Sequence, residues 1–186
     1  GAALFWLVAL VWVRRYPGDV QRWDRPFFML LIGLLLLVPT WAGLVQLHGQ
    51  SPWWLMYVLL LVWGADTGAY FAGRRYGKVK LAPSVSPAKT REGLYGGLVT
   101  TSIIMLVVAF NLQLAGLQFL LFAVVSATTV LASVLGDLFE SMVKRRAGIK
   151  DSGKIFPGHG GALDRIDSIT AAAPVFLAGW WLAGGF

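Results

Sequence analysis

Six apolar segments alternate with polar connections along this chain of 186 residues. The segments consist mostly of Leu, Val, Ala, Phe and Trp, and they are Gly1–Val13, Phe27–Leu47, Pro52–Phe71, Leu94–Leu112, Leu114–Phe139 and Leu163–Phe186. Such runs predict membrane-spanning α-helices, because a spanning helix needs about 20 predominantly apolar residues. Transmembrane β-strands would need short alternating segments, and the sequence has none. We therefore expect an all-α, polytopic membrane bundle of about six transmembrane helices.

The first apolar segment is too short to span a bilayer by itself. It has no initiator Met and no basic stretch of the kind that opens a signal peptide. We expect that the sequence begins inside a helix, that N-terminal helices precede it, and that residues 1–186 form a single transmembrane domain.

The basic residues are confined to alternate connections. Residues 14–26, 74–92 and 144–165 hold all 16 Lys and Arg, whereas residues 48–51 and 113–116 hold none. By the positive-inside rule the three basic connections face the cytoplasm, and a bacterial inner membrane is the expected location. This topology also accounts for the net charge of +7, so we expect no nucleic-acid partner.

Five carboxylates lie near the predicted cytoplasmic ends of three apolar segments: Asp66, Asp137, Glu140, Asp164 and Asp167. Asp66 lies roughly 8 Å from the end of its segment, at about 1.5 Å per residue. An ionised Asp inside a membrane helix costs about 2.5–3.5 kcal/mol, so several at one depth need a wet cavity, a metal or basic partners. Pairing with nearby Lys and Arg, which would only hold the helices together, is the simpler alternative.

Spacing favours convergence of these groups. Asp164 and Asp167 are three residues apart, and Asp137 and Ser141 are four apart, so each pair is expected to share a helix face. Asp66, Tyr70 and Gly73 fall on one helical stripe. Carboxylates in this arrangement suit Mg²⁺, which uses one or two protein carboxylates and takes further ligands from water and substrate phosphates.

Two basic connections are also rich in glycine. One runs from Gly73 to Gly93 and the other from Lys144 to Gly161, where it contains Pro-Gly-His-Gly-Gly. Glycine lets backbone N–H groups approach phosphate oxygens, and Lys and Arg neutralise them. No Walker A sequence is present. Together with the carboxylates, these loops point to phosphoryl-type transfer at the membrane surface.

The same residues carry a family resemblance. Ser141-x-x-Lys-Arg, followed by Lys150-Asp151, Pro157-Gly-His-Gly-Gly161 and Asp164-Arg-Ile-Asp167, closely resembles the signature of phosphatidate cytidylyltransferases (CDP-diacylglycerol synthases). Two more blocks, 66–78 and 86–93, are similar to other parts of that family. Ala88, Arg91 and Ala162 depart from the family pattern.

The resemblance implies transfer of the cytidylyl group from CTP to phosphatidate, which gives CDP-diacylglycerol and pyrophosphate. It implies an integral membrane homodimer among membrane lipids and a Mg²⁺ cofactor, with a second cation left open. Asp137 and Asp164 are then the expected metal ligands, followed by Asp167.

The resemblance also assigns a wider site. Catalytic roles fall to Asp137, Asp164, Lys144, Arg145 and His159. Substrate-binding roles fall to Asp66, Lys78, Lys89, Ser141, Lys150, Asp151, Gly160, Gly161 and Arg165. Two alternatives stay open: a CTP-dependent kinase of polyprenol or phytol, or a transferase on another lipid phosphate; and, less favoured, an ion-coupled transporter whose buried acids bind cations.

Overall fold

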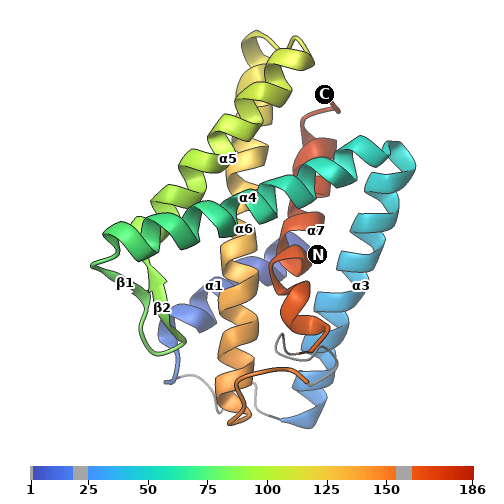
Figure 1. Cartoon of the computed structure of the whole chain (residues 1–186). Helices are drawn as coiled ribbons and strands as arrows, with labels where there is room; N and C mark the ends of the chain where they lie inside the picture. Colours follow the sequence, from blue (N-terminus) through green and yellow to red (C-terminus); the bar gives the residue numbers. More distant parts are fainter. Residues whose placement is uncertain (1, 19–24, 154–160) are drawn as a thin grey trace.

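The protein is described by a computed structural model that covers residues 2–18, 25–153 and 161–186 (Figure 1). The described helices are α1 (Ala2–Arg15), α3 (Pro26–Gln50), α4 (Pro52–Tyr76), α5 (Arg91–Asn111), α6 (Gly116–Arg146), the short 3₁₀ helix η1 (Leu163–Arg165) and α7 (Asp167–Leu182). Each predicted apolar segment overlaps one of the α-helices. The expected all-α membrane fold is therefore confirmed.

Four helices, α3 to α6, are long and apolar enough to cross a membrane by length and composition. In contrast, α1 has 14 residues and α7 has 16. The count of about six spans therefore stays a prediction. The boundaries also differ from those predicted, because α6 continues past Phe139 to Arg146 and carries the first basic residues of the predicted loop on a helix.

The connection between α4 and α5 contains an antiparallel hairpin that we expected only as a loop. Strand β1 (Lys80–Ala82) pairs with β2 (Ser86–Thr90), with Lys80 opposite Thr90 and Ala82 opposite Ser86. The strands are too short for their alternation to stand out in the sequence. The hairpin matters because it fixes Lys89 within β2, where a flexible loop would leave this side chain unplaced.

Helix α6 runs through the middle of the molecule, and α4 crosses it at a steep angle (Figure 1). On one part of α6, Phe122 is fully buried and stacks on Tyr57 of α4 at a centroid distance of 5.2 Å. Nearer its basic end, Phe139 is fully buried and packs edge-on against Phe5 and Trp6 of α1. One apolar cluster thus packs around Phe122 and another around Phe139, further along α6. The part of α6 between them faces the hairpin and α7.

Glycines allow α4 and α5 to approach closely. A Cβ on Gly68 would lie 2.7 Å from the Gly96 carbonyl oxygen, and one on Gly97 would lie 2.8 Å from the Ala65 carbonyl oxygen. These distances are below any normal contact and both involve backbone oxygens. A Cβ on Gly64 would instead meet the Ile104 side chain at 2.5 Å, so Gly64 and Gly68 both face α5, as their spacing indicates.

We predict that Gly97→Ala destabilises the protein relative to Gly33→Ala. Both substitutions gain the same helix propensity, but a Cβ at Gly33 of α3 meets nothing within 4 Å. Overpacking typically costs about 1–3 kcal/mol, so the Gly97 variant should have the lower Tm in detergent. Equal melting temperatures for the two variants would contradict the close approach of α4 and α5.

Candidate functional site

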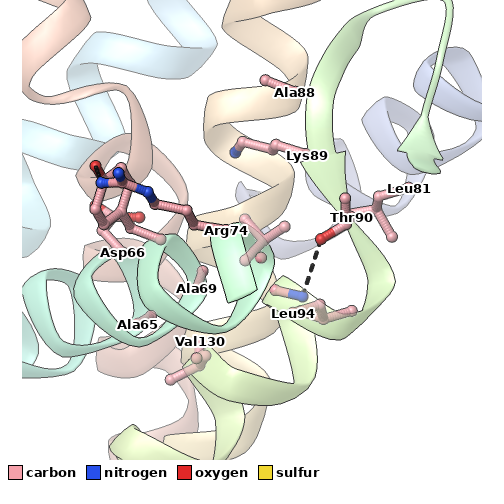
Figure 2. Close-up of a pocket in the computed structure, with 15 residues that line it drawn as sticks. Ala65, Asp66, Ala69, Arg74, Leu81, Ala88, Lys89, Thr90, Leu94 and Val130 are labelled. Carbon is pink, nitrogen blue, oxygen red and sulfur yellow. Dashed lines mark hydrogen bonds between the residues drawn. The ribbon is translucent and has the colours of Figure 1, made fainter. Parts of the chain in front are cut away.

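A cavity of about 380 Å³ lies between α4, α5, α6 and the hairpin (Figure 2). Much of its wall is small or apolar, and its polar lining side chains include Asp66, Tyr70 and Arg74 from α4. Lys89 and Thr90 line it from the hairpin. Figure 2 shows Lys89 extending from β2 and Asp66 and Arg74 on the α4 side. A few polar groups in an otherwise apolar cavity are typical of a binding site.

Lys89 links the hairpin to α6 through an ion pair with Asp137. Their side chains are 27% and 25% exposed, so the pair is only partly screened by solvent. Ser141 Oγ donates to Asp137 Oδ1 at 3.3 Å, as the four-residue spacing predicts. Asp66 lines the same cavity as Lys89 and lies within electrostatic range of Lys89, Asp137 and Asp167. Carboxylates from α4, α6 and the start of α7 therefore lie within electrostatic range of one lysine, which Asp137 contacts.

Gly136 permits this convergence. A Cβ at Gly136 would lie 2.6 Å from the Asp167 carbonyl oxygen and 3.2 Å from Ala171 Cβ. The first turn of α7 can therefore pack directly on α6 beside Asp137. Any larger side chain at Gly136 would push Asp167 away from the cluster.

Lys144 lies about two helical turns beyond Asp137 on α6 and forms a second group of ion pairs. Its Nζ lies 2.7 Å from Glu140 Oε2 and 2.6 Å from Asp164 Oδ1. The three side chains are only 14%, 6% and 11% exposed. The pairing with basic residues that we weighed as an alternative does occur, and it joins α6 to η1.

Asp164 holds together the two ends of the glycine-rich connection. Its Oδ2 accepts hydrogen bonds from the backbone N–H groups of Ser152, at 2.9 Å, and Gly161, at 2.7 Å. Burial raises the pKa of Asp164, but Lys144 and these N–H groups outweigh burial and hold the pKa well below its usual range. The stabilisation from ionised Asp164 is therefore present above the usual pKa of about 3.9 and is lost as the pH falls through the lowered value.

The expectation that Asp164 and Asp167 share a helix face is wrong. Asp164 belongs to η1, whereas Asp167 is the first residue of α7. The 3₁₀ turn between them changes the direction of the chain. Asp164 consequently faces Lys144 and the glycine-rich connection, while Asp167 interacts with Asp137 and Lys89.

Most of the other predicted site residues are exposed or lie outside the described structure. Lys78 is exposed and its backbone N–H donates to Glu92 Oε2 at 3.1 Å. Arg145 is exposed and reaches the Ile149 carbonyl at 3.4 Å. Lys150, Asp151 and Arg165 are also exposed, and Gly161 contributes its backbone N–H to Asp164. The predictions for His159 and Gly160 fall outside the described residues.

The sequence did not lead us to assign three side chains to the site: Tyr70, Arg74 and Glu140. Arg74 Nη1 donates to the Tyr70 hydroxyl at 3.1 Å, and both line the cavity beside Asp66. The signal was present, because residues 66, 70 and 74 recur every four positions on one helix face. Glu140 was noted as an acid but was given no role in the site.

The oxygen atoms of these carboxylates suit a divalent cation that takes its other ligands from a substrate. No three acidic or histidine side chains within the described parts of the chain converge closely enough to hold a metal by themselves. However, the carboxylates of Glu140 and Asp167 neighbour each other, and Asp137 lies within electrostatic range of Asp167. A site in which protein oxygens fill only a few of the metal's coordination positions fits Mg²⁺ bound together with a phosphate-bearing substrate.

Comparison with known proteins shows which family the chain belongs to. The sequence profile of the cytidylyltransferase family matches residues 1–182. The chain belongs to the cytidylyltransferase family. It is 49% identical to a phosphatidate cytidylyltransferase of Pseudomonas aeruginosa over 98% of this chain and 68% of the relative. It is 46% identical to one of Haemophilus influenzae over 94% of this chain and 65% of the relative.

A more distant relative extends the same result. A phosphatidate cytidylyltransferase of Rickettsia bellii is 35% identical over 97% of this chain and 85% of its own length. The chain thus spans about two thirds of the length of its two most similar relatives named here. The family membership confirms the resemblance in the sequence, and it identifies this protein as a transferase of the nucleotidyl class in the membrane.

For this cytidylyltransferase we predict that Lys144→Met is strongly destabilising. The substitution leaves the carboxylates of Glu140 and Asp164 without their lysine, and breaking a buried ion pair costs about 3–5 kcal/mol. The free energy of unfolding in mixed micelles measures the loss. Lys150→Met, at an exposed lysine, is the control and should change stability by less than about 0.5 kcal/mol.

Adding Glu140→Gln to the Lys144 variant should recover part of the lost stability, because one uncompensated charge is removed. If the double variant were as unstable as the sum of the two single variants, Lys144 and Glu140 would not be coupled.

Proposed function

We propose that this protein transfers the cytidylyl group of CTP to phosphatidate and releases pyrophosphate. The observation that carries the proposal is the ion pair between Lys89 and Asp137 beside a largely apolar cavity that Lys89 and Asp66 line. A lipid phosphate and a nucleotide triphosphate both need cations, and their reaction needs a partly dry site in which those charges act strongly. The names of the relatives support the choice of substrates.

The reaction forms one bond and breaks one. A phosphatidate oxygen attacks the α-phosphorus of CTP, a new P–O bond forms, and the bond from the α-phosphorus to the bridging oxygen of the β-phosphate breaks. Phosphatidate already carries an anionic oxygen, so the protein need not supply a strong nucleophile. The work of the side chains is then to position two anions and to stabilise the charge of the departing pyrophosphate.

Lys89 and Lys144 are the described cations best placed for that work. Each pairs with a carboxylate, and each could pair with a phosphate oxygen of a substrate instead. The exchange would free Asp137 and Glu140 as oxygen ligands. Ser141 would orient Asp137, and Asp164 would keep the glycine-rich connection closed beside Lys144.

We infer that Mg²⁺ is the cofactor and that Asp137 and Asp167 are its best-placed protein ligands. Asp164 is a third candidate through the oxygen that now faces Lys144. When bound, the ion would withdraw charge from the phosphate oxygens and so favour the displacement. The remaining predicted substrate contacts lie between the last turn of α6 and the start of α7 and are proposed to face CTP: Arg145, Lys150, Asp151, His159 and Arg165.

The orientation in the membrane follows from charge. The basic residues at the ends of α1, α4 and α6 favour placing the site on the cytoplasmic side of a bacterial inner membrane. The family resemblance supports a homodimer, and light scattering of the purified protein in detergent would measure the mass of the assembly.

Asp137→Asn should abolish CTP-dependent turnover while the protein still folds. The amide cannot pair with Lys89 as a carboxylate does, and it is a poor ligand for Mg²⁺. Purified protein is incubated with radiolabelled CTP and phosphatidate, and product lipid, pyrophosphate and CDP are quantified. The unmodified protein should give CDP-diacylglycerol and pyrophosphate in equal amounts, whereas release of CDP would indicate a kinase.

The loss in the Asp137 variant should be at least about 100-fold, with an unchanged elution profile in detergent. Near-normal turnover in a folded Asp137→Asn protein would remove this residue from the reaction.

Chelation should have a reversible effect on the unmodified protein. Excess EDTA is expected to stop turnover, and Mg²⁺ added beyond the chelator should restore it, because phosphate transfer of this type needs the charge of the ion. Full activity in EDTA would show that Lys89 and Lys144 suffice without a divalent cation.

A further inference from the structure

A carboxylate at the base of the hairpin, Glu92 in the first turn of α5, accepts hydrogen bonds from the chain that leads into β1. Its Oε2 accepts from the backbone N–H groups of Lys78, at 3.1 Å, and Val79, at 3.2 Å. The Val79 nitrogen also lies 3.3 Å from Oε1. Hydrogen bonds from N–H groups to a carboxylate are roughly twice as strong as those between neutral groups. One side chain therefore holds both backbone groups that precede β1.

Two neighbouring hydrogen bonds complete the base of the hairpin. The Arg91 N–H donates to the Val79 carbonyl at 2.8 Å. Thr90 Oγ1 accepts from the Gly93 N–H at 3.1 Å and so caps α5 (Figure 2). Lys80 lies opposite Thr90 in the strand pairing. The start of β1, the end of β2 and the first turn of α5 are thus tied together by polar contacts.

The two ends of the hairpin are held in different ways. Val85 at the tip is 1% exposed and belongs to the apolar cluster that contains Phe139. Lys89 lies toward the other end, three residues before Glu92, and pairs with Asp137. Apolar packing at the tip does not fix the base, where the chain leaves α4 and enters α5. The position of Lys89 therefore depends on the polar contacts at the base.

We propose that Glu92 is a positioning residue that holds the base of the hairpin in place and so sets Lys89 against Asp137. The proposal rests on the proposed function, which gives Lys89 its part in the reaction. Glu92 acts through Lys89 and not on the substrate, in the way that residues behind a binding group orient it. Its effect on the reaction must therefore disappear when Lys89 is absent.

Two substitutions separate the reach of this side chain from its charge. Glu92→Asp keeps an acid in the first turn of α5, where it is favourable, but withdraws the carboxylate by about 1.5 Å. Glu92→Gln keeps an oxygen that can accept from both N–H groups. With CTP and phosphatidate, kcat/KM should fall about tenfold in Glu92→Asp and stay within about threefold in Glu92→Gln. Full activity of Glu92→Asp, or a greater loss in Glu92→Gln than in Glu92→Asp, would overturn the proposal.

Arg91→Ala is the matched control. Arg91 is exposed, precedes Glu92 in the same turn and does not line the cavity. Its contact at the base is made by the backbone N–H, which alanine retains. The turnover and Tm of this variant should match those of the unmodified protein. A loss of turnover as large as that of Glu92→Asp would show that any change in this turn disturbs the enzyme, against a specific role for Glu92.

The decisive comparison places Glu92→Asp in a Lys89→Met protein. Because Glu92 acts through Lys89, adding Glu92→Asp should change the residual kcat/KM of the Lys89 variant by less than about twofold. If the two losses multiply, Glu92 acts by another route and the proposal is wrong.

A second readout does not depend on turnover. The coupling between Lys89→Met and Asp137→Asn, measured from free energies of unfolding in mixed micelles, should fall by about half or more in the Glu92→Asp protein. General destabilisation would lower each free energy but leave the coupling unchanged, and an unchanged coupling would overturn the proposal. If the unmodified protein makes no CDP-diacylglycerol, the proposed reaction fails, while this coupling still shows whether Glu92 holds Lys89 against Asp137.

Discussion

The placement of charge within an apolar fold depends on the ion pair between Lys89 and Asp137. An unpaired carboxylate at this position on α6 would be costly in a membrane, and an unpaired lysine on the hairpin would not be held over the cavity. The pair satisfies both groups and fastens the hairpin to α6. Because the pair is only partly buried, polar groups from outside can reach it without disrupting the helices.

The glycines explain how so much charge reaches one place. Gly136 brings the first turn of α7 against α6, and the glycines of α4 and α5 let those helices pack with backbone contact. The approach of α7 brings Asp167 close to α6 beside Asp137, and the approach of α4 and α5 closes one wall of the cavity that Lys89 lines. The apolar clusters around Phe122 and Phe139 supply the stability that permits a site of partly compensated charges between them.

The sequence predicted the fold class and the order of the helices, because long apolar runs are a strong signal. It grouped Asp66, Asp137, Glu140, Asp164 and Asp167, and in the structure Asp137 pairs with Lys89 while Glu140 and Asp164 pair with Lys144. It did not predict the hairpin, since β1 and β2 are short and their position depends on α6. It also misplaced Asp164 relative to Asp167, because a 3₁₀ turn is not visible in a polar, glycine-rich segment. Arg74 was missed although it repeats the four-residue spacing of Asp66 and Tyr70.

The most direct measurement is a double-mutant cycle on the central ion pair. Lys89→Met, Asp137→Asn and the double variant are compared by their free energies of unfolding in mixed micelles. The structure predicts that the double variant loses clearly less stability than the two single variants together, with a coupling energy of about 1 kcal/mol or more. Additive losses, within about 0.5 kcal/mol, would show that Lys89 and Asp137 do not hold the hairpin to α6.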